Sequence, residues 1–140
     1  MSGDFIDSNV FVYLFDETDE RKRGTAGRIV ESGLQTRSAV ISFQVVQETL
    51  NVVTRKLAIP MTAEGAKSFM ENVLAPLFRV PASIPLYNRA LDVQARYRYS
   101  FYDSLIIAAA LNTGCDRLYS EDLQSGQRIE GLKIENPFET

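Results

Sequence analysis

The chain of 140 residues has no histidine and no tryptophan, and Cys115 is its single cysteine. Without histidine, no Ser-His-Asp or Cys-His catalytic arrangement can form, and no imidazole can act as a general base. The usual ligand set of a zinc site is also missing. A lone cysteine cannot form a disulfide within the chain, which fits a reducing cytoplasm. If the protein is an enzyme, we expect carboxylates and a hard cation such as Mg²⁺ or Mn²⁺ to carry its chemistry.

The sequence also lacks a long hydrophobic run. The apolar stretch from Leu105 to Leu111 is far shorter than the roughly 20 residues that span a membrane. A secretory signal would require a basic segment followed by an apolar one. The opening stretch has no such segments, and Asp4 and Asp7 interrupt it. The composition, 45% hydrophobic and 24% charged, is that of a globular protein. We therefore expect a single domain over residues 1–140, located in the cytoplasm and without membrane contact.

A net charge of −3 is unfavourable for binding nucleic acid, because neutralising phosphates requires Lys and Arg. Composition alone thus favours a soluble protein without a polyanionic partner. Some basic residues could still contact a nucleic-acid backbone, and interleaved tyrosines could stack on bases. These residues are Arg55, Lys56, Arg96, Arg98 and Arg117, with Tyr97, Tyr99 and Tyr102. The alternative for most of them is a core aromatic ring or a cation whose stem lies along the surface.

Short apolar segments alternate with helical patterns along the chain. We expect strands at residues 5–6, 39–41, 78–80, 118–119 and 132–134, and helices at 27–34, 62–74, 85–97 and from about 100 to before Gly114. A further helix follows Ser42, whose hydroxyl we expect to cap it, and Pro60 ends it. The segment 16–23 is interpreted as a loop or an exposed helix start. Strands that alternate with helices predict a mostly parallel sheet with helices on both faces.

Four acidic residues occur where such a sheet would bind a ligand, outside the carboxyl ends of its strands. Asp7 ends the first strand, and Asp122 follows the fourth. Glu48 lies nearly two turns into the helix after Ser42, on the side that faces the protein. Asp103 stands three residues after Ser100, so it lies in the first turn of a helix.

Each acid also has an ordinary structural interpretation. Asp103 could cap its helix, Asp7 and Asp122 could be turn residues, and Glu48 could be a solvated helix residue. Taken together, converging carboxylates without basic partners would repel one another, and a bound cation would remove that cost. The spacing therefore predicts a metal site, with Asp7 and Asp103 as direct ligands and Glu48 and Asp122 bonding through water or to a second ion.

Several motifs in this order resemble the PIN-domain nucleases, and closely the toxin ribonucleases of the VapC type. The resemblance extends over almost the whole chain and rests on Phe5-Ile6-Asp7-Ser8-Asn9, Gln47-Glu48, the segment from Tyr102-Asp103 to Ala110, Tyr119-Ser120-Glu121-Asp122-Leu123, and Asn136-Pro137-Phe138. It implies a three-layer α/β/α fold, a Mg²⁺ or Mn²⁺ site, hydrolysis of RNA, an antitoxin that blocks the site, and a homodimer.

Carried over by position, Asp7, Glu48, Asp103 and Asp122 match the family's acidic residues, and Asn9 and Ser120 match polar residues near them. The family's acid follows Ser or Thr by two positions, which selects Asp122 rather than Glu121. The four acids Asp7, Glu48, Asp103 and Asp122 would hold the metal that activates water for attack on the phosphodiester. Ser120 and Asn9 would orient waters or a phosphate oxygen.

Other functions remain open at this point. A phosphoacceptor domain would need an acidic pair on the first strand, which Ser8 and Asn9 do not supply. A catalytically silent PIN-like interaction module would be expected to have lost one of the four acids, and none is missing. A DNA-directed nuclease with the same site is a further alternative, since nothing in the sequence reads a 2′-hydroxyl.

Overall fold

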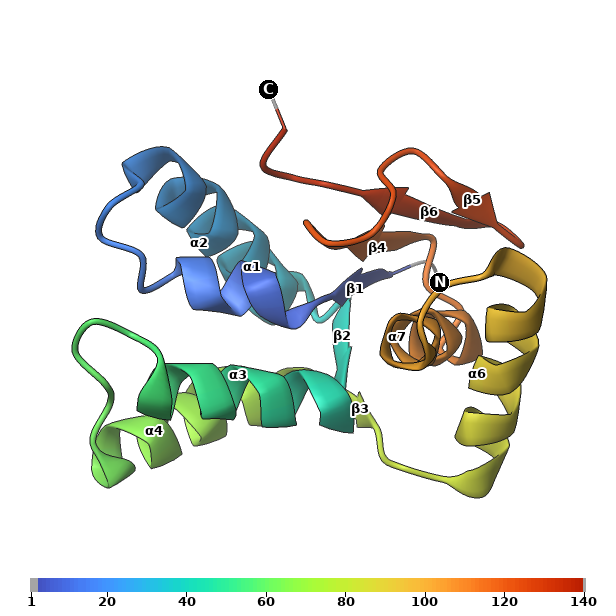
Figure 1. The fold of residues 1–140 in the computed structure, drawn as a ribbon. Coiled ribbons are helices and arrows are strands. Elements are labelled where there is room, and N and C mark those ends of the chain that lie inside the picture. Colours follow the sequence, from blue (N-terminus) through green and yellow to red (C-terminus); the bar gives the residue numbers. More distant parts are fainter. Residues whose placement is uncertain (1–2, 140) are drawn as a thin grey trace.

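A mixed sheet of six strands forms the centre of the protein (Figure 1). A computed structural model describes residues 3–139. The strands run in the order β3-β2-β1-β4-β6-β5, and every neighbouring pair is parallel except β5 and β6. The predicted α/β class with a mostly parallel sheet is therefore confirmed. The strands are β1 (Asp4–Ile6), β2 (Ala39–Ser42), β3 (Phe78–Val80), β4 (Arg117–Tyr119), β5 (Arg128–Ile129) and β6 (Leu132–Glu135).

Helices cover both faces of this sheet and give it three layers (Figure 1). One face packs against α2, and the other packs against α7 along β2 and β4. The helical elements are α1 (Ser8–Tyr13), α2 (Glu20–Thr36), α3 (Phe43–Arg55), α4 (Ala63–Phe69), the π-helix η1 (Met70–Leu74), α5 (Ala75–Leu77), α6 (Ile84–Tyr97) and α7 (Phe101–Asn112). None of the helices within residues 3–139 is long and apolar enough to cross a membrane.

The two helical layers are built differently. In α7 every residue from 104 to 110 is buried, which is the expected location of a helix that is apolar on all sides. On the other face, α2 approaches β2 very closely at Gly33. A Cβ atom at Gly33 would lie 2.5 Å from the Cβ of Ala39, so only glycine permits this spacing.

Several boundaries differ from the sequence-based expectations. The helix expected at 27–34 begins at Glu20, because Asp19 caps it by accepting a hydrogen bond from the backbone N–H of Lys22 at 3.0 Å. Ser42 does precede α3, but its hydroxyl makes no capping bond. The short antiparallel strand β5 was not predicted, since two residues carry almost no periodic signal.

Candidate active site

Asp7 is the most deeply buried acid of the predicted site and lies at the carboxyl end of β1. Its Oδ1 accepts a hydrogen bond from the backbone N–H of Ser8 at 2.7 Å, and its Oδ2 accepts one from the hydroxyl of Ser120 at 2.8 Å. Burial raises the pKa of Asp7 from 3.8 to about 6; the two hydrogen bonds oppose this, and the charges of Glu48 and Asp122 add to it. A perturbed carboxyl at this end of a parallel sheet is a candidate functional group.

The two polar residues of the predicted site, Asn9 and Ser120, connect Asp7 to Asp122. The amide of Asn9 donates to Oδ2 of Asp122 at 3.1 Å, and the backbone N–H of Asp122 donates to Oγ of Ser120 at 3.3 Å. The hydroxyl of Ser120 is therefore shared between the two acids. Asp122 itself is exposed, so its carboxylate is open to solvent beside a buried one.

Glu48 reaches the same site from α3 through Ser8. The hydroxyl of Ser8 donates to Oε1 of Glu48 at 3.2 Å and lies 3.5 Å from Oδ1 of Asp7. No role was predicted for Ser8. Its signal was available, because Ser8 stands between Asp7 and Asn9, in the motif that ends the first strand.

Asp103 lies in the first turn of α7, as predicted, and its backbone N–H donates to the hydroxyl of Ser100 at 3.2 Å. Among residues 3–139, the Asp103 carboxylate makes no hydrogen bond or ion pair. It therefore does not accept from the backbone N–H of Ser100, as it would in a complete capping box. The side-chain amide of Gln44 donates to the carbonyl of Tyr102 at 3.1 Å. Because Gln44 and Glu48 are four residues apart, this bond places the start of α7 beside the face of α3 that carries Glu48.

Glu121, the acid next to Asp122, is engaged elsewhere. The hydroxyl of Tyr13 donates to Oε1 of Glu121 at 2.6 Å, and the ammonium of Lys22 donates to Oε2 at 2.8 Å and to the Tyr13 hydroxyl at 3.0 Å. Burial acts to raise the pKa of Glu121, but the bonds from Lys22 and Tyr13 lower it overall. We call these three residues the Glu121 clamp. It was not predicted, because Lys22 lies far from the site motifs in sequence.

The chemistry of these side chains fits a hard cation, although the acids are not preassembled around one point. Carboxylate and hydroxyl oxygens are suitable ligands for Mg²⁺ or Mn²⁺. Within the described part of the chain, no three acidic or cysteine side chains are close enough together to hold one metal ion. The structure brings Asp7, Glu48 and Asp122 together through hydrogen-bond partners, and it records no such connection for Asp103.

Several buried polar atoms lie in the segments that carry two of these acids. Four side-chain atoms are buried without a hydrogen-bond partner in residues 3–139: the hydroxyls of Ser42, Thr49 and Ser104, and Oε1 of Gln44. Three of them belong to the β2–α3 segment that carries Glu48, and Ser104 follows Asp103. Buried polar groups normally find a partner, so this region is suited to ordered water.

The basic and aromatic residues proposed for nucleic-acid contact have varied surroundings. Arg117 pairs with Asp4 and its guanidinium lies 4.5 Å from the centre of the Tyr119 ring. The hydroxyl of Tyr99 donates to the side chain of Gln127, whereas Tyr102 is 67% exposed. Of the three tyrosines, Tyr102 is therefore the one that is most open for stacking.

Comparison with known proteins agrees with this architecture. The PIN domain family profile matches residues 5–127, so the chain belongs to the PIN domain family. Comparison with curated proteins found no match.

Solved structures of toxin–antitoxin proteins share the fold. VapC20 of Mycobacterium tuberculosis, described as a sarcin-ricin loop cleaving toxin, is 24% identical with a TM-score of 0.61, over 86% of this chain and 90% of that one. A toxin–antitoxin complex from Klebsiella pneumoniae is 17% identical with a TM-score of 0.69, over 99% and 100%. DNA-bound VapBC from Salmonella typhimurium is 19% identical with a TM-score of 0.67, over 98% and 99%. These similarities confirm the predicted PIN-like fold.

Proposed function

We propose that this chain is a metal-dependent endoribonuclease and the toxin of a toxin–antitoxin pair. The observation that carries the proposal is the position of Asp7. In a PIN domain, this buried acid lies at the carboxyl end of β1 and is connected by hydrogen bonds through Ser8 and Ser120 to the segments that carry Glu48 and Asp122. The arrangement concentrates negative charge where a parallel sheet binds its ligand. A cation offsets that charge.

Each side chain has a proposed role in this site. Asp7 and Asp103 would be direct ligands of Mg²⁺ or Mn²⁺, and Glu48 and Asp122 would hold water or a second ion. When bound, the ion would supply an activated water near neutral pH and charge stabilisation at the phosphate. The chain has no histidine that could activate the water instead.

The polar neighbours would fix these carboxylates in place. Ser120 donates to Asp7 and Asn9 donates to Asp122, so both acids present their remaining lone pairs in fixed directions. The Glu121 clamp holds the backbone next to Asp122 against α1 and α2. The Glu121 carboxylate already accepts hydrogen bonds from Lys22 and Tyr13, which supports Asp122 rather than Glu121 as the acid of the site.

RNA and an antitoxin are the proposed partners. One structural neighbour is described as cleaving the sarcin-ricin loop, and others are toxin–antitoxin complexes, which supports both assignments. An acidic site with a perturbed carboxyl would favour a basic antitoxin side chain, and Arg can bind carboxylates in bidentate fashion. We also propose a homodimer in the cytoplasm.

Incubation of the purified protein with structured RNA tests the activity. We expect endonucleolytic cleavage with Mg²⁺ or Mn²⁺ and none with EDTA, and we expect products with 5′-phosphate and 3′-hydroxyl ends because water is the nucleophile. Full cleavage in EDTA would contradict the metal mechanism, and 2′,3′-cyclic phosphate would show that the 2′-oxygen attacks instead. A parallel reaction with DNA of the same sequence separates the DNA-directed alternative, and no cleavage of either would favour the silent interaction module.

A further inference from the structure

A row of charged residues crosses the sheet at the end opposite the acidic site. The strand register pairs Asp4 of β1 with Arg117 of β4, Arg117 with Lys133 of β6, and Lys133 with Arg128 of β5. Residues directly opposite one another on neighbouring strands project from the same face, about 5 Å apart. Three cations therefore lie side by side on adjacent strands, with one acid at the end of the row.

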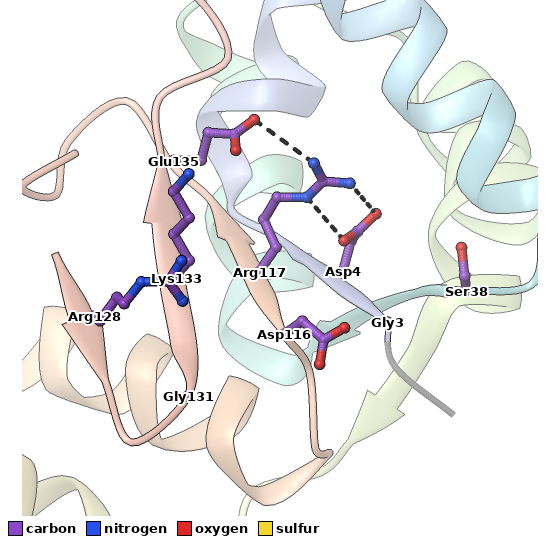
Figure 2. A pocket seen from close by; sticks show the side chains of 9 residues that line it. All are labelled: Gly3, Asp4, Ser38, Asp116, Arg117, Arg128, Gly131, Lys133 and Glu135. Atoms are coloured by element: carbon purple, nitrogen blue, oxygen red, sulfur yellow. Dashed lines mark hydrogen bonds and ion pairs between the residues drawn. The ribbon is translucent and has the colours of Figure 1, made fainter. Parts of the chain in front are cut away.

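Only the first of these cations is neutralised by close ion pairs. Arg117 forms a two-point contact with Asp4 at 3.0 and 3.2 Å, and Glu135 lies 3.8 Å from it on the other side (Figure 2). In residues 3–139, neither Lys133 nor Arg128 has a carboxylate within 4.0 Å. Like charges directly opposite each other on paired strands are destabilising, so this hairpin retains a repulsion that an anion would relieve.

The surface around these cations is open and hollowed. A pocket of about 580 Å³ is lined by the whole charged row together with Gly3, Ser38, Asp116, Gly131 and Glu135. Figure 2 shows Lys133 and Arg128 on the β5–β6 side of this pocket, whereas the carboxylate of Asp116 points toward Gly3 on the other side. Lys133 is half-buried and Arg128 is exposed, and α2 covers the other end of this face, over β1 and β2.

We infer that Lys133 and Arg128 form an anion site that binds a phosphate of the RNA backbone away from the cleaved bond. This inference rests on the proposed function. Arg128 and Lys133 are directly opposite each other on paired strands, and two cations placed in this way can contact the oxygens of one phosphodiester. The site supplies part of the positive charge that a protein of net charge −3 needs to bind RNA.

The position of the pair suits a substrate that reaches both ends of the sheet. Asp4 belongs to the charged row and Asp7 to the acidic site. The three residue steps between them correspond to about 10 Å along the strand. β6 and β5 lie two and three strands away from β1. A strand of RNA a few nucleotides long covers such a distance, so one phosphate can bind at the pair while another lies at Asp7.

The test is the binding of a labelled single-stranded RNA to the full-length protein in EDTA, over a range of salt concentrations. In R128Q/K133Q the dissociation constant at low salt is expected to rise at least fivefold. The slope of log K against log salt should fall by about 0.7, the value for one lost phosphate contact on a single strand. The control R79Q/K67Q removes the same charge from β3 and α4. If the double variant does not fold, the single variant R128Q changes only an exposed side chain.

The outcomes separate this inference from the proposed function. The anion site is supported if RNA binding is weaker in R128Q/K133Q but not in the control R79Q/K67Q, while kcat for metal-dependent cleavage is unchanged. Equal affinity of parent and variant, or equal weakening in the control, overturns it while leaving the nuclease intact. A variant that loses affinity for polyglutamate but not for RNA would assign the surface to an acidic protein segment instead. RNA binding without cleavage under any metal overturns only the nuclease. Absence of RNA binding by the parent in EDTA overturns the anion site, while the nuclease is decided by the cleavage assay with metal.

Discussion

The ammonium of Lys22 in α2 lies 2.8 Å from Oε2 of Glu121 in the loop after β4, although the two residues are 99 positions apart in the sequence. About three quarters of each side chain is shielded from solvent, so this ion pair is screened less than a surface pair. The backbone N–H of Glu121 also donates to the amide oxygen of Asn9 at 3.3 Å. The ion pair and the bond to Asn9 therefore anchor the residue next to Asp122 from two sides, and the Glu121 carboxylate is occupied by Lys22 and Tyr13.

Glu121→Gln should separate a positioning role from a ligand role. We expect it to lower cleavage about tenfold and to cost about 1 kcal/mol of stability, because the ion pair with Lys22 is lost while the Tyr13 hydrogen bond can persist. Asp122→Asn should lower cleavage by about a hundredfold with little change in stability. Cleavage rates and thermal melting of both variants provide the measurement.

Lys22→Met is the matched control for that pair of variants, since it breaks the same ion pair from the other side. Its effect on cleavage should equal that of Glu121→Gln. If Glu121→Gln were more damaging than Asp122→Asn, the assignment of the two neighbouring acids would have to be exchanged.

Asp7→Asn should make the metal-free protein more stable, and the gain should depend on pH. Burial raises the folded-state pKa of Asp7 to about 6 from 3.8, so between these two values the unfolded chain releases its proton first and the parent protein loses stability as the pH rises. The variant does not titrate at this position. In EDTA its advantage should be absent below pH 4 and reach about 3 kcal/mol above pH 6, as measured by urea unfolding. A constant difference from pH 4 to 8 would contradict the raised pKa.

How much of this site the sequence reveals depends on the range of the contacts. Asp7, Asn9, Ser120 and Asp122 lie at strand ends, and the rule that parallel strands end at one edge is enough to bring them together. The Glu121 clamp could not be predicted in this way, because Lys22 lies in the segment 16–23, which was interpreted as a loop or an exposed helix start and was not connected to the site. Periodicity shows which face of a helix is buried, and it does not show which polar residue of a distant helix will meet a given loop.

The same limit applies to the end of the sheet with the charged row. β5 was missed because it has two residues, and the alignment of Arg128 with Lys133 follows from the register of that hairpin. Apolar patterns fix register only where one face is buried. Ile129 and Leu132 bury the opposite face of this hairpin, but a strand of two residues gives too little pattern to predict that register, so the pairing of charges becomes visible only in the structure.

Asp103→Asn tests whether this acid is a metal ligand or a helix cap. As a cap, it would lose a favourable charge at the positive end of α7 and destabilise the protein by up to about 1 kcal/mol. We expect instead no loss of stability in EDTA, because the carboxylate makes no hydrogen bond among the described residues, and the start of α7 lies beside the face of α3 that carries Glu48. The thermal shift that saturating Mn²⁺ gives the parent should be reduced. A variant that is less stable in EDTA yet keeps the full Mn²⁺ shift would identify Asp103 as a cap.

Ser120→Ala should raise the pKa of Asp7 further and thereby shift metal binding to higher pH. The Ser120 hydroxyl donates to Oδ2 of Asp7 at 2.8 Å, and this bond lowers the pKa of Asp7 by stabilising its charged form. Without it, a larger fraction of Asp7 is protonated at a given pH, so the acidic limb of the pH profile for Mn²⁺ binding should move upward. Ser104→Ala is the matched control, since Ser104 is equally buried but its hydroxyl has no partner in residues 3–139. An unchanged profile in Ser120→Ala, or the same displacement in both variants, would show that this hydrogen bond does not govern the charge of Asp7.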